Sequence, residues 1–188
     1  MSFRNEIKLK TSNCMEHRFI KWLNNNNGKK IHPNREVTSI YFDTDNLNSF
    51  NDSIEGIVPR KKIRLRTYNN FQFNKGQNVF HEEKFSSVEG RYKTVKKINS
   101  FKTNMNIGIF DNFYGIVRPK VRVSYERSYF VCNNLRFTID KKLNYSLAQR
   151  SKNIIKDENI IIELKSTSDL DVETFLDENQ FERTRFSK

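Results

Sequence analysis

The sequence has few of the residues that interrupt regular structure and no long apolar run. It contains only 6 glycines and 3 prolines in 188 residues, which disfavours collagen-like and linker-rich chains. A helix that spans a membrane needs about 18 or more consecutive apolar residues, and no such run occurs. The N-terminal segment also lacks the apolar core of a secretory signal. We therefore expect a cytoplasmic location, with any link to a membrane made through a partner protein.

Cysteines and glycine-rich nucleotide motifs are equally scarce. The two cysteines, Cys14 and Cys132, form neither a CxxC pair nor a zinc-ligand pattern. We expect two free, buried thiols in a reducing cytosol, and a single disulfide is the alternative. Neither GxGxxG nor GxxxxGK[ST] occurs, so the common glycine-loop nucleotide sites are excluded. The three histidines are scattered, and we assign a catalytic role to none of them.

Basic charge and aromatic residues are what the sequence does contain. Lys and Arg number 34 against 22 Asp and Glu, so the formal net charge is +12. A field of this sign favours phosphates, nucleic acid or acidic lipid as partners. Aromatic residues make up 13% of the chain, more than is typical of disordered chains, so we expect a folded protein. The length suits a single domain over residues 1–188.

The apolar periodicity predicts many strands and few helices. Met15, Phe19 and Leu23 recur at helical spacing and predict one helix over these residues. Two further helices are expected over residues 44–50, where Thr44 and Asp45 offer an N-cap, and over 172–179. A first strand is expected near the N-terminus. Further strands are expected at 37–42, 60–68, 79–85, 92–98, 120–131, 135–140 and 160–165. This pattern fits a mainly antiparallel α+β domain, with a closed barrel as one form of it.

Nearly every expected strand has one charged face and one apolar face, because side chains i and i+2 share a face. In the strand over 60–68, for example, Arg64 and Arg66 alternate with Ile63 and Leu65. One interpretation is a sandwich or open sheet whose charged face meets water. The other is a barrel with its charged faces turned inward. Such a lumen would carry a large desolvation and repulsion cost, which a chain of phosphates would offset.

The charged strands also resemble a known family. The matching segments are RNEIK, VTSIYFDTDNLNSFNDSIEG, RLR, EEK, GRYKTVKK, VRVSYERSYF, RFTID, IIELK and the terminal RFSK. In this order they resemble the VTC domain, the polyphosphate polymerase domain of the vacuolar transporter chaperone family. That family lies within the triphosphate tunnel metalloenzyme (CYTH-like) superfamily. The resemblance spans almost the whole chain and implies a closed, eight-stranded antiparallel β tunnel with flanking helices and a charged lumen.

The resemblance implies phosphoryl transfer from ATP to a growing polyphosphate chain, assisted by Mn²⁺ or Mg²⁺. Tunnel triphosphatases typically begin with E-x-E-x-K, whereas Arg4 stands here at the first glutamate. This departure favours the VTC-type branch over a triphosphatase or an adenylate cyclase. Two alternatives stay open: a tunnel triphosphatase that hydrolyses nucleotide or inorganic triphosphate, and a non-catalytic module that binds polyphosphate.

The resemblance assigns a set of cations to the phosphate chain. They are Lys8, Arg64, Arg66, Lys84, Lys96, Arg122, Arg136 and Lys188. The four arginines would clamp phosphate oxygens and stabilise the transition state, and the lysines would act as point charges. Lys93 is the alternative to Lys96, because the register of that strand is ambiguous.

The carboxylates have more varied expected roles. Glu163 resembles the metal-binding glutamate of the family, which suits a cation that prefers hard oxygen ligands. Glu6 and Glu82 are weaker metal candidates and are equally expected as counter-ions. Asp140 is expected to pair with Arg136.

ATP and polyphosphate are therefore the expected partners, and nucleic acid is not. A nucleic-acid-binding β domain would place aromatic residues for base stacking beside the basic ones. Here the aromatic residues mostly alternate out of phase with the basic residues. Tyr41 could stack on a nucleotide base, but we expect a structural role for it.

Overall fold

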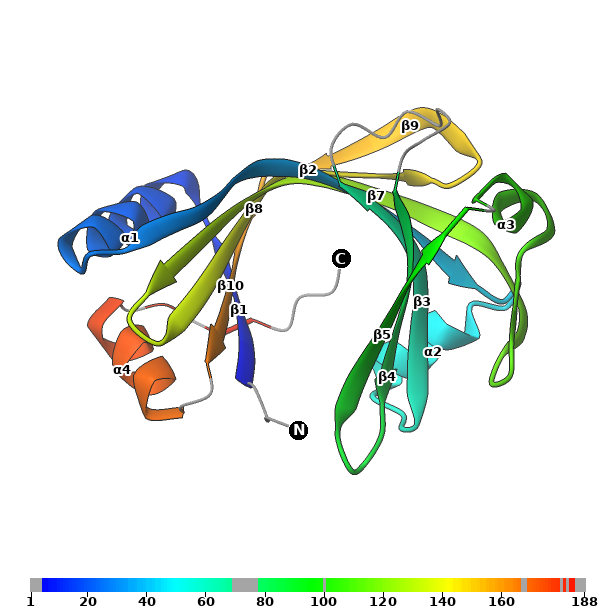
Figure 1. Ribbon diagram of the computed structural model, residues 1–188, viewed down its shortest axis with the longest axis horizontal. Helices are drawn as coiled ribbons and strands as arrows, with labels where there is room; N and C mark the ends of the chain where they lie inside the picture. Colours follow the sequence, from blue (N-terminus) through cyan, green and yellow to red (C-terminus); the bar gives the residue numbers. More distant parts are fainter. Residues whose placement is uncertain are drawn as a thin grey trace. The chain divides into compact units, whose positions relative to one another are not determined.

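The computed structural model describes residues 5–68, 78–99, 101–166, 169–179, 181 and 183–184 (Figure 1). Within these ranges the helices are α1 (Asn13–Asn25), α2 (Asn48–Glu55), α3 (Phe101–Ile107) and α4 (Asp169–Asn179). The strands are β1 (Asn5–Thr11), β2 (Lys29–Asp43), β3 (Arg60–Tyr68), β4 (Val79–Ser86), β5 (Arg91–Ile98), β6 (Ile109–Asp111), β7 (Gly115–Cys132), β8 (Leu135–Leu147), β9 (Arg150–Asp157) and β10 (Ile160–Ser166). The prediction of a mainly antiparallel α+β fold is confirmed.

The strand pairing corrects the expectation of a closed, eight-stranded tunnel. The described residues form ten strands in the order β1-β10-β8-β7-β2-β3-β4-β5, with β6 on β7 and β9 on β8. β1 and β5 end this path, and over the described residues no ladder joins them. The two additional strands, β6 and β9, carry too little apolar alternation to be recognised from sequence. The alternation of charged and apolar residues also predicts only which face of the sheet a side chain occupies. It does not predict which strands pair, and therefore not whether the sheet closes.

The predicted helices are present with somewhat different ends. α1 begins at Asn13, and the N-cap Ser12 accepts a hydrogen bond from the Met15 N–H at 3.5 Å. α2 begins at Asn48, later than expected. Its first turn is capped by the Asp43 carboxylate, which accepts hydrogen bonds from the Ser49 and Phe50 N–H groups at 2.9 Å each. The sequence did not predict α3, β6 or β9, nor that β2 begins at Lys29.

Contacts divide the chain into two compact units, each made of separate chain segments. The first comprises Met1–Glu36, Tyr125–Leu143 and Lys156–Lys188, and the second comprises Val37–Ser124 and Asn144–Ile155. β2, β7, β8 and β9 each run from one unit into the other.

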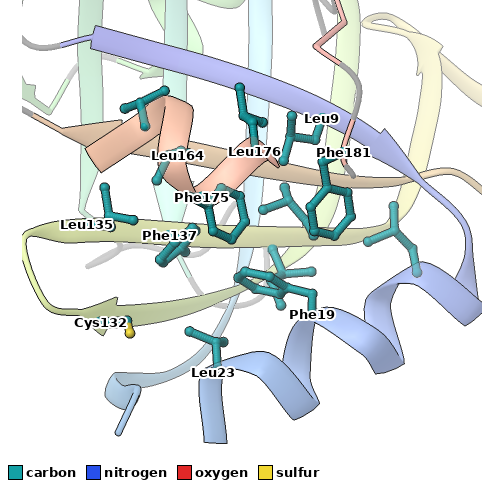
Figure 2. Close-up of a cluster of buried hydrophobic side chains, with 14 residues drawn as sticks. Leu9, Phe19, Leu23, Cys132, Leu135, Phe137, Leu164, Phe175, Leu176 and Phe181 are labelled. Atoms are coloured by element: carbon teal, nitrogen blue, oxygen red, sulfur yellow. The ribbon is translucent and has the colours of Figure 1, made fainter. Parts of the chain in front are cut away.

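In the first unit, α1 and α4 pack their aromatic side chains on β8 (Figure 2). Phe19 of α1 and Phe175 of α4 lie 6.0 Å apart between ring centroids, and both contact Phe137 of β8, at 5.0 and 5.1 Å. Leu164 of β10 is fully buried in the same cluster. Because successive strand residues point to opposite faces, this packing directs the preceding residue, Glu163, to the other face of the sheet.

In the second unit, the apolar side of β3 is buried under α3 and the β6–β7 hairpin. Ile63 and Leu65 are 2% and 1% exposed, and Phe101 and Met105 of α3 pack against their cluster. The intervening residues of β3, which are basic, therefore share the opposite face. This arrangement confirms that the β3 alternation separates an apolar face from a charged one.

Three smaller expectations concern the cysteines, the membrane and the C-terminal segment. Both cysteines are free thiols as expected, and Cys132 is buried, but Cys14 is exposed on the first turn of α1 and not buried as expected. None of the helices in the described part of the chain is long and apolar enough to cross a membrane. Near the C-terminus, Arg183 forms an antiparallel bridge with Leu9 of β1. Lys188, the expected tunnel lysine of the terminal motif, lies outside the described residues.

Candidate functional site

In the second unit, β3, β4 and β5 present a common face on which cations greatly outnumber carboxylates. The registers place Arg64 opposite Glu82, and Lys84 opposite Lys62 on one side and Lys93 on the other. Alternate residues share a face, so this face carries four cations from β3, one from β4 and three from β5. These eight are Arg60, Lys62, Arg64, Arg66, Lys84, Arg91, Lys93 and Lys97. We call this surface the basic face. Glu82 is its one carboxylate over these three strands, which are described throughout.

Glu82 is held by three of these cations. Its Oε2 lies 2.7 Å from Arg64 Nε and 2.6 Å from Arg64 NH2, and its Oε1 lies 2.7 Å from Lys93 Nζ. Arg66 NH1 is 3.7 Å from Oε2. Burial acts to raise the pKa of Glu82, but Arg64, Arg66 and Lys93 outweigh it and lower that pKa to about 2. The geometry is that of a counter-ion, one of the two roles expected for Glu82.

Two hydroxyl groups of β2 lie beside the arginines of the basic face. Tyr41 is directly opposite Arg64 in the register, and its oxygen accepts a hydrogen bond from Arg64 NH1 at 2.9 Å. Ser39 is opposite Arg66, and its oxygen accepts from Arg66 Nε at 3.0 Å. Burial acts to raise the pKa of Tyr41, but the charges of Arg64 and Arg66 outweigh it, so the pKa is below its ordinary value. Sequence reasoning treated Tyr41 as structural and overlooked Ser39.

The register of β5 favours Lys93 over Lys96. Lys93 lies opposite Lys84 and its ammonium contacts Glu82. Lys96 lies opposite His81, on the face that carries the apolar residues of β3. Lys96, the lysine chosen from the sequence, therefore does not share the face of the arginines. The alternative, Lys93, does share that face. The sequence could not decide because both lysines follow from a one-residue difference in register.

A second charged cluster lies in the first unit, around Glu163. Lys165 Nζ is 2.8 Å from Glu163 Oε1 and 3.6 Å from Glu6 Oε2. Lys8 is directly opposite Glu163 in the register, and its Nζ lies 3.9 Å from Glu6 Oε1. Burial acts to raise the pKa of Glu163, but the cations around it, led by Lys165 and Arg127, lower that pKa to about 2. Glu163 is therefore ionised at neutral pH.

The partner of Asp140 differs from the one expected. Arg127 binds both carboxylate oxygens of Asp140, at 2.6 and 2.7 Å, and its NH2 lies 3.9 Å from Glu163 Oε2. Arg136 is exposed and lies opposite Lys165 in the register. Sequence reasoning extended the alternation of β7 from Arg122 and so overlooked Arg127.

The alternation of β7 predicts that Glu126 shares the charged face with Arg122. In the structure Glu126 accepts hydrogen bonds from Asn34 and Lys142, each at 2.9 Å. Lys142 has a φ of 53°, which interrupts the regular pleat of β8 beside Glu126. Arg122 itself is half-buried on β7, within the second unit.

The cluster around Glu163 offers oxygen ligands of the kind that Mg²⁺ and Mn²⁺ prefer. These cations often take one or two carboxylates and complete their shell with phosphate oxygens and water. Glu163 and Glu6 both reach the Lys165 ammonium, and the buried Thr138 hydroxyl, opposite Glu163, has no hydrogen-bond partner among the described residues. Within the residues that the structure describes, no group of three or more His, Cys, Asp or Glu side chains is placed to hold a metal ion. The residues fit a cation that arrives with phosphates rather than a pre-formed metal cage.

The family match covers nearly all of the chain. The VTC domain family matches residues 5–188. The chain belongs to the VTC domain family. This VTC domain has no match among the curated proteins.

Solved structures resemble this VTC domain in fold. One is a protein from Vibrio parahaemolyticus with a provisional assignment as an adenylate cyclase. It has a TM-score of 0.59 and 13% identity, and the match covers 99% of this chain and 95% of the other. Another is an adenylyl cyclase-type protein from Hippeastrum, itself a provisional assignment, described as having a dominant triphosphatase activity. It has a TM-score of 0.53 and 15% identity, with 99% and 93% of the two chains covered.

Proposed function

We propose that this VTC domain is a metal-dependent phosphotransferase that makes inorganic polyphosphate from ATP. The observation that carries the proposal is the basic face, where one buried carboxylate accompanies eight cations. Membership of the VTC domain family supports the polymerase activity in particular.

The basic face suits a phosphate chain because its cations follow the strand direction. Arg60, Lys62, Arg64 and Arg66 recur at every second residue of β3, so neighbouring charges are about 7 Å apart. Arg guanidinium groups bind phosphate oxygens in a bidentate manner, and Lys ammonium groups act as point charges. The row therefore presents guanidinium and ammonium donors at regular intervals, which is the arrangement that the oxygens of an extended phosphate chain favour.

Phosphoryl transfer requires positioning and charge stabilisation more than covalent chemistry from the protein. Arg64 and Arg66 would bind equatorial phosphate oxygens and stabilise the charge that develops on them. Lys84, Lys93 and Arg122 would add cationic contacts from the second unit. In the first unit, Lys8 and Arg136 are proposed for the same role.

Glu163, with Glu6, would hold the divalent cation. When bound, Mn²⁺ or Mg²⁺ supplies Lewis-acid neutralisation of phosphate charge. Arg127 and Lys165 keep Glu163 ionised, so its oxygens remain available as ligands across the neutral pH range.

The test is a synthesis assay on the full chain with ATP and Mn²⁺. We expect an acid-labile polymer and ADP from the wild-type protein. Arg64→Ala and Glu163→Gln should each reduce the rate at least tenfold, and the exposed Glu178→Gln on α4 serves as the matched control. Polymer formation that survives both substitutions would contradict the proposed residue roles.

A tunnel triphosphatase is the second candidate. The Hippeastrum protein with the same fold is described as having a dominant triphosphatase activity. Under that alternative the same assay yields inorganic phosphate and ADP without polymer. A third outcome, tight binding of polyphosphate with no turnover of ATP, would identify a binding module.

A further inference from the structure

The hydroxyls of Ser39 and Tyr41 share an arrangement that the proposed function has not used. Each lies on β2 directly opposite one arginine of β3, and each oxygen accepts a hydrogen bond from that arginine. An arginine has no acceptor atom, so neither hydroxyl can donate to its partner. Among the described residues, neither hydroxyl hydrogen has an acceptor.

The surroundings of these two hydrogens are cationic and largely closed to water. Ser39 is 1% exposed, and Tyr41 is half-buried with its ring 5.7 Å from the Arg64 guanidinium carbon. A buried hydroxyl that lacks an acceptor costs free energy, so the site gains when an acceptor arrives. An anionic oxygen is the acceptor that the neighbouring arginines favour.

The two positions also match the spacing of a phosphate chain along the strands. Ser39 and Tyr41 are two residues apart on β2, as Arg66 and Arg64 are on β3. Each hydroxyl–arginine pair can therefore present donors to a different part of one extended anion.

We infer that Ser39 and Tyr41 form a hydroxyl row that donates hydrogen bonds to the bound phosphate chain while each oxygen orients one arginine. The inference rests on the proposed function for the identity of the anion. It assigns two direct phosphate contacts to β2 in addition to the cations of β3, β4 and β5.

Calorimetric titration of the full chain with inorganic tripolyphosphate tests the row. Tyr41→Phe and Ser39→Ala should each weaken binding about tenfold, the loss expected for one hydrogen bond to a charged acceptor. Tyr92→Phe is the matched control, because Tyr92 lies opposite Phe85 on the other face of β5. Thermal unfolding of each variant verifies that it is folded.

A tyrosine analogue separates donation to the anion from a role limited to holding Arg64. 3-Fluorotyrosine at position 41 keeps the oxygen and strengthens O–H donation, when measured at a pH where the phenol is protonated. Tighter tripolyphosphate binding is expected, whereas weaker or unchanged binding would overturn the inference for Tyr41.

The outcomes also separate this inference from the proposed function. Wild-type binding that is unchanged by Tyr41→Phe and Ser39→Ala overturns the hydroxyl row and leaves the phosphate site intact. Failure of the wild-type protein to bind tripolyphosphate overturns both.

Discussion

Arg64 NH2 lies 2.6 Å from Glu82 Oε2, and Arg64 Nε lies 2.7 Å from the same oxygen. One buried oxygen therefore binds two nitrogens along one edge of the guanidinium plane, while Tyr41 accepts from NH1 on another. Lys93 holds the other oxygen of Glu82. The orientation of Arg64 is set by the protein before any ligand arrives, and such preorganisation favours binding and catalysis.

Glu82→Gln should lower the free energy of unfolding by about 3 kcal/mol at neutral pH. The substitution leaves Arg64, Arg66 and Lys93 close together without their shared carboxylate, and breaking a buried ion pair has a cost of this order. Urea denaturation followed by circular dichroism measures the change. Glu89→Gln, in the exposed β4–β5 turn, is the control. Equal midpoints for the two variants would show that Glu82 is not the counter-ion of the cluster.

The same carboxylates predict a loss of stability in acid. Glu82 and Glu163 have folded-state pKa values of about 2, against an ordinary value of 4.5. Because their pKa values are lowered on folding, they stabilise the protein fully above the unfolded value and lose this contribution as the pH falls toward 2. The difference in stability between the wild-type protein and Glu82→Gln should therefore shrink across this window. A difference that stays constant from pH 6 to pH 2.5, measured by thermal unfolding, would refute the assignment.

Lys93→Ala should weaken tripolyphosphate binding several-fold more than Lys96→Ala. Lys93 lies on the basic face and Lys96 lies on the opposite face, beside His81. Both substitutions remove one positive charge from the same exposed strand. The Lys96→Ala variant therefore measures how much binding is lost through the change in net charge alone. Calorimetry at two salt concentrations separates direct contact from long-range attraction, which salt screens. Equal losses would indicate that only net charge matters at this edge.

Arg127→Leu should destabilise the protein by about 3–5 kcal/mol, because it leaves the fully buried Asp140 carboxylate without its bidentate partner. Arg136→Leu should change stability by about 0.5 kcal/mol or less, since Arg136 is exposed. Chemical denaturation compares the two. The reverse order would restore Arg136 as the partner of Asp140.

The face of each side chain was predictable where a strand is short and regular. In β3 the alternation of Arg64 and Arg66 with Ile63 and Leu65 is what the structure shows. On β7, an 18-residue strand, the same reasoning overlooked Arg127, which binds Asp140. Alternation assumes a regular pleat over the whole strand, and one extra residue in a long strand is enough to move every later side chain to the other face.

The sequence did not predict which residues of neighbouring strands lie opposite one another. The choice between Lys93 and Lys96 depended on the register of β5 against β4, which an alternating pattern with basic residues in both phases does not specify. The hydroxyls of Ser39 and Tyr41 were visible in the S-I-Y segment, but their role depends on which β3 residues lie opposite. Closure was inferred from the family resemblance, and the ends of the strand path, β1 and β5, do not pair over the described residues.

The imbalance of charge on β3, β4 and β5 also has a practical consequence at the bench. Such a surface behaves as a small anion exchanger, so protein prepared at low ionic strength is expected to carry cellular polyanions with it. Phosphate and sulfate buffers should compete for the same donors and depress apparent affinity. A high-salt wash followed by exchange into a buffer with a monovalent, weakly coordinating anion should therefore increase the measured binding capacity.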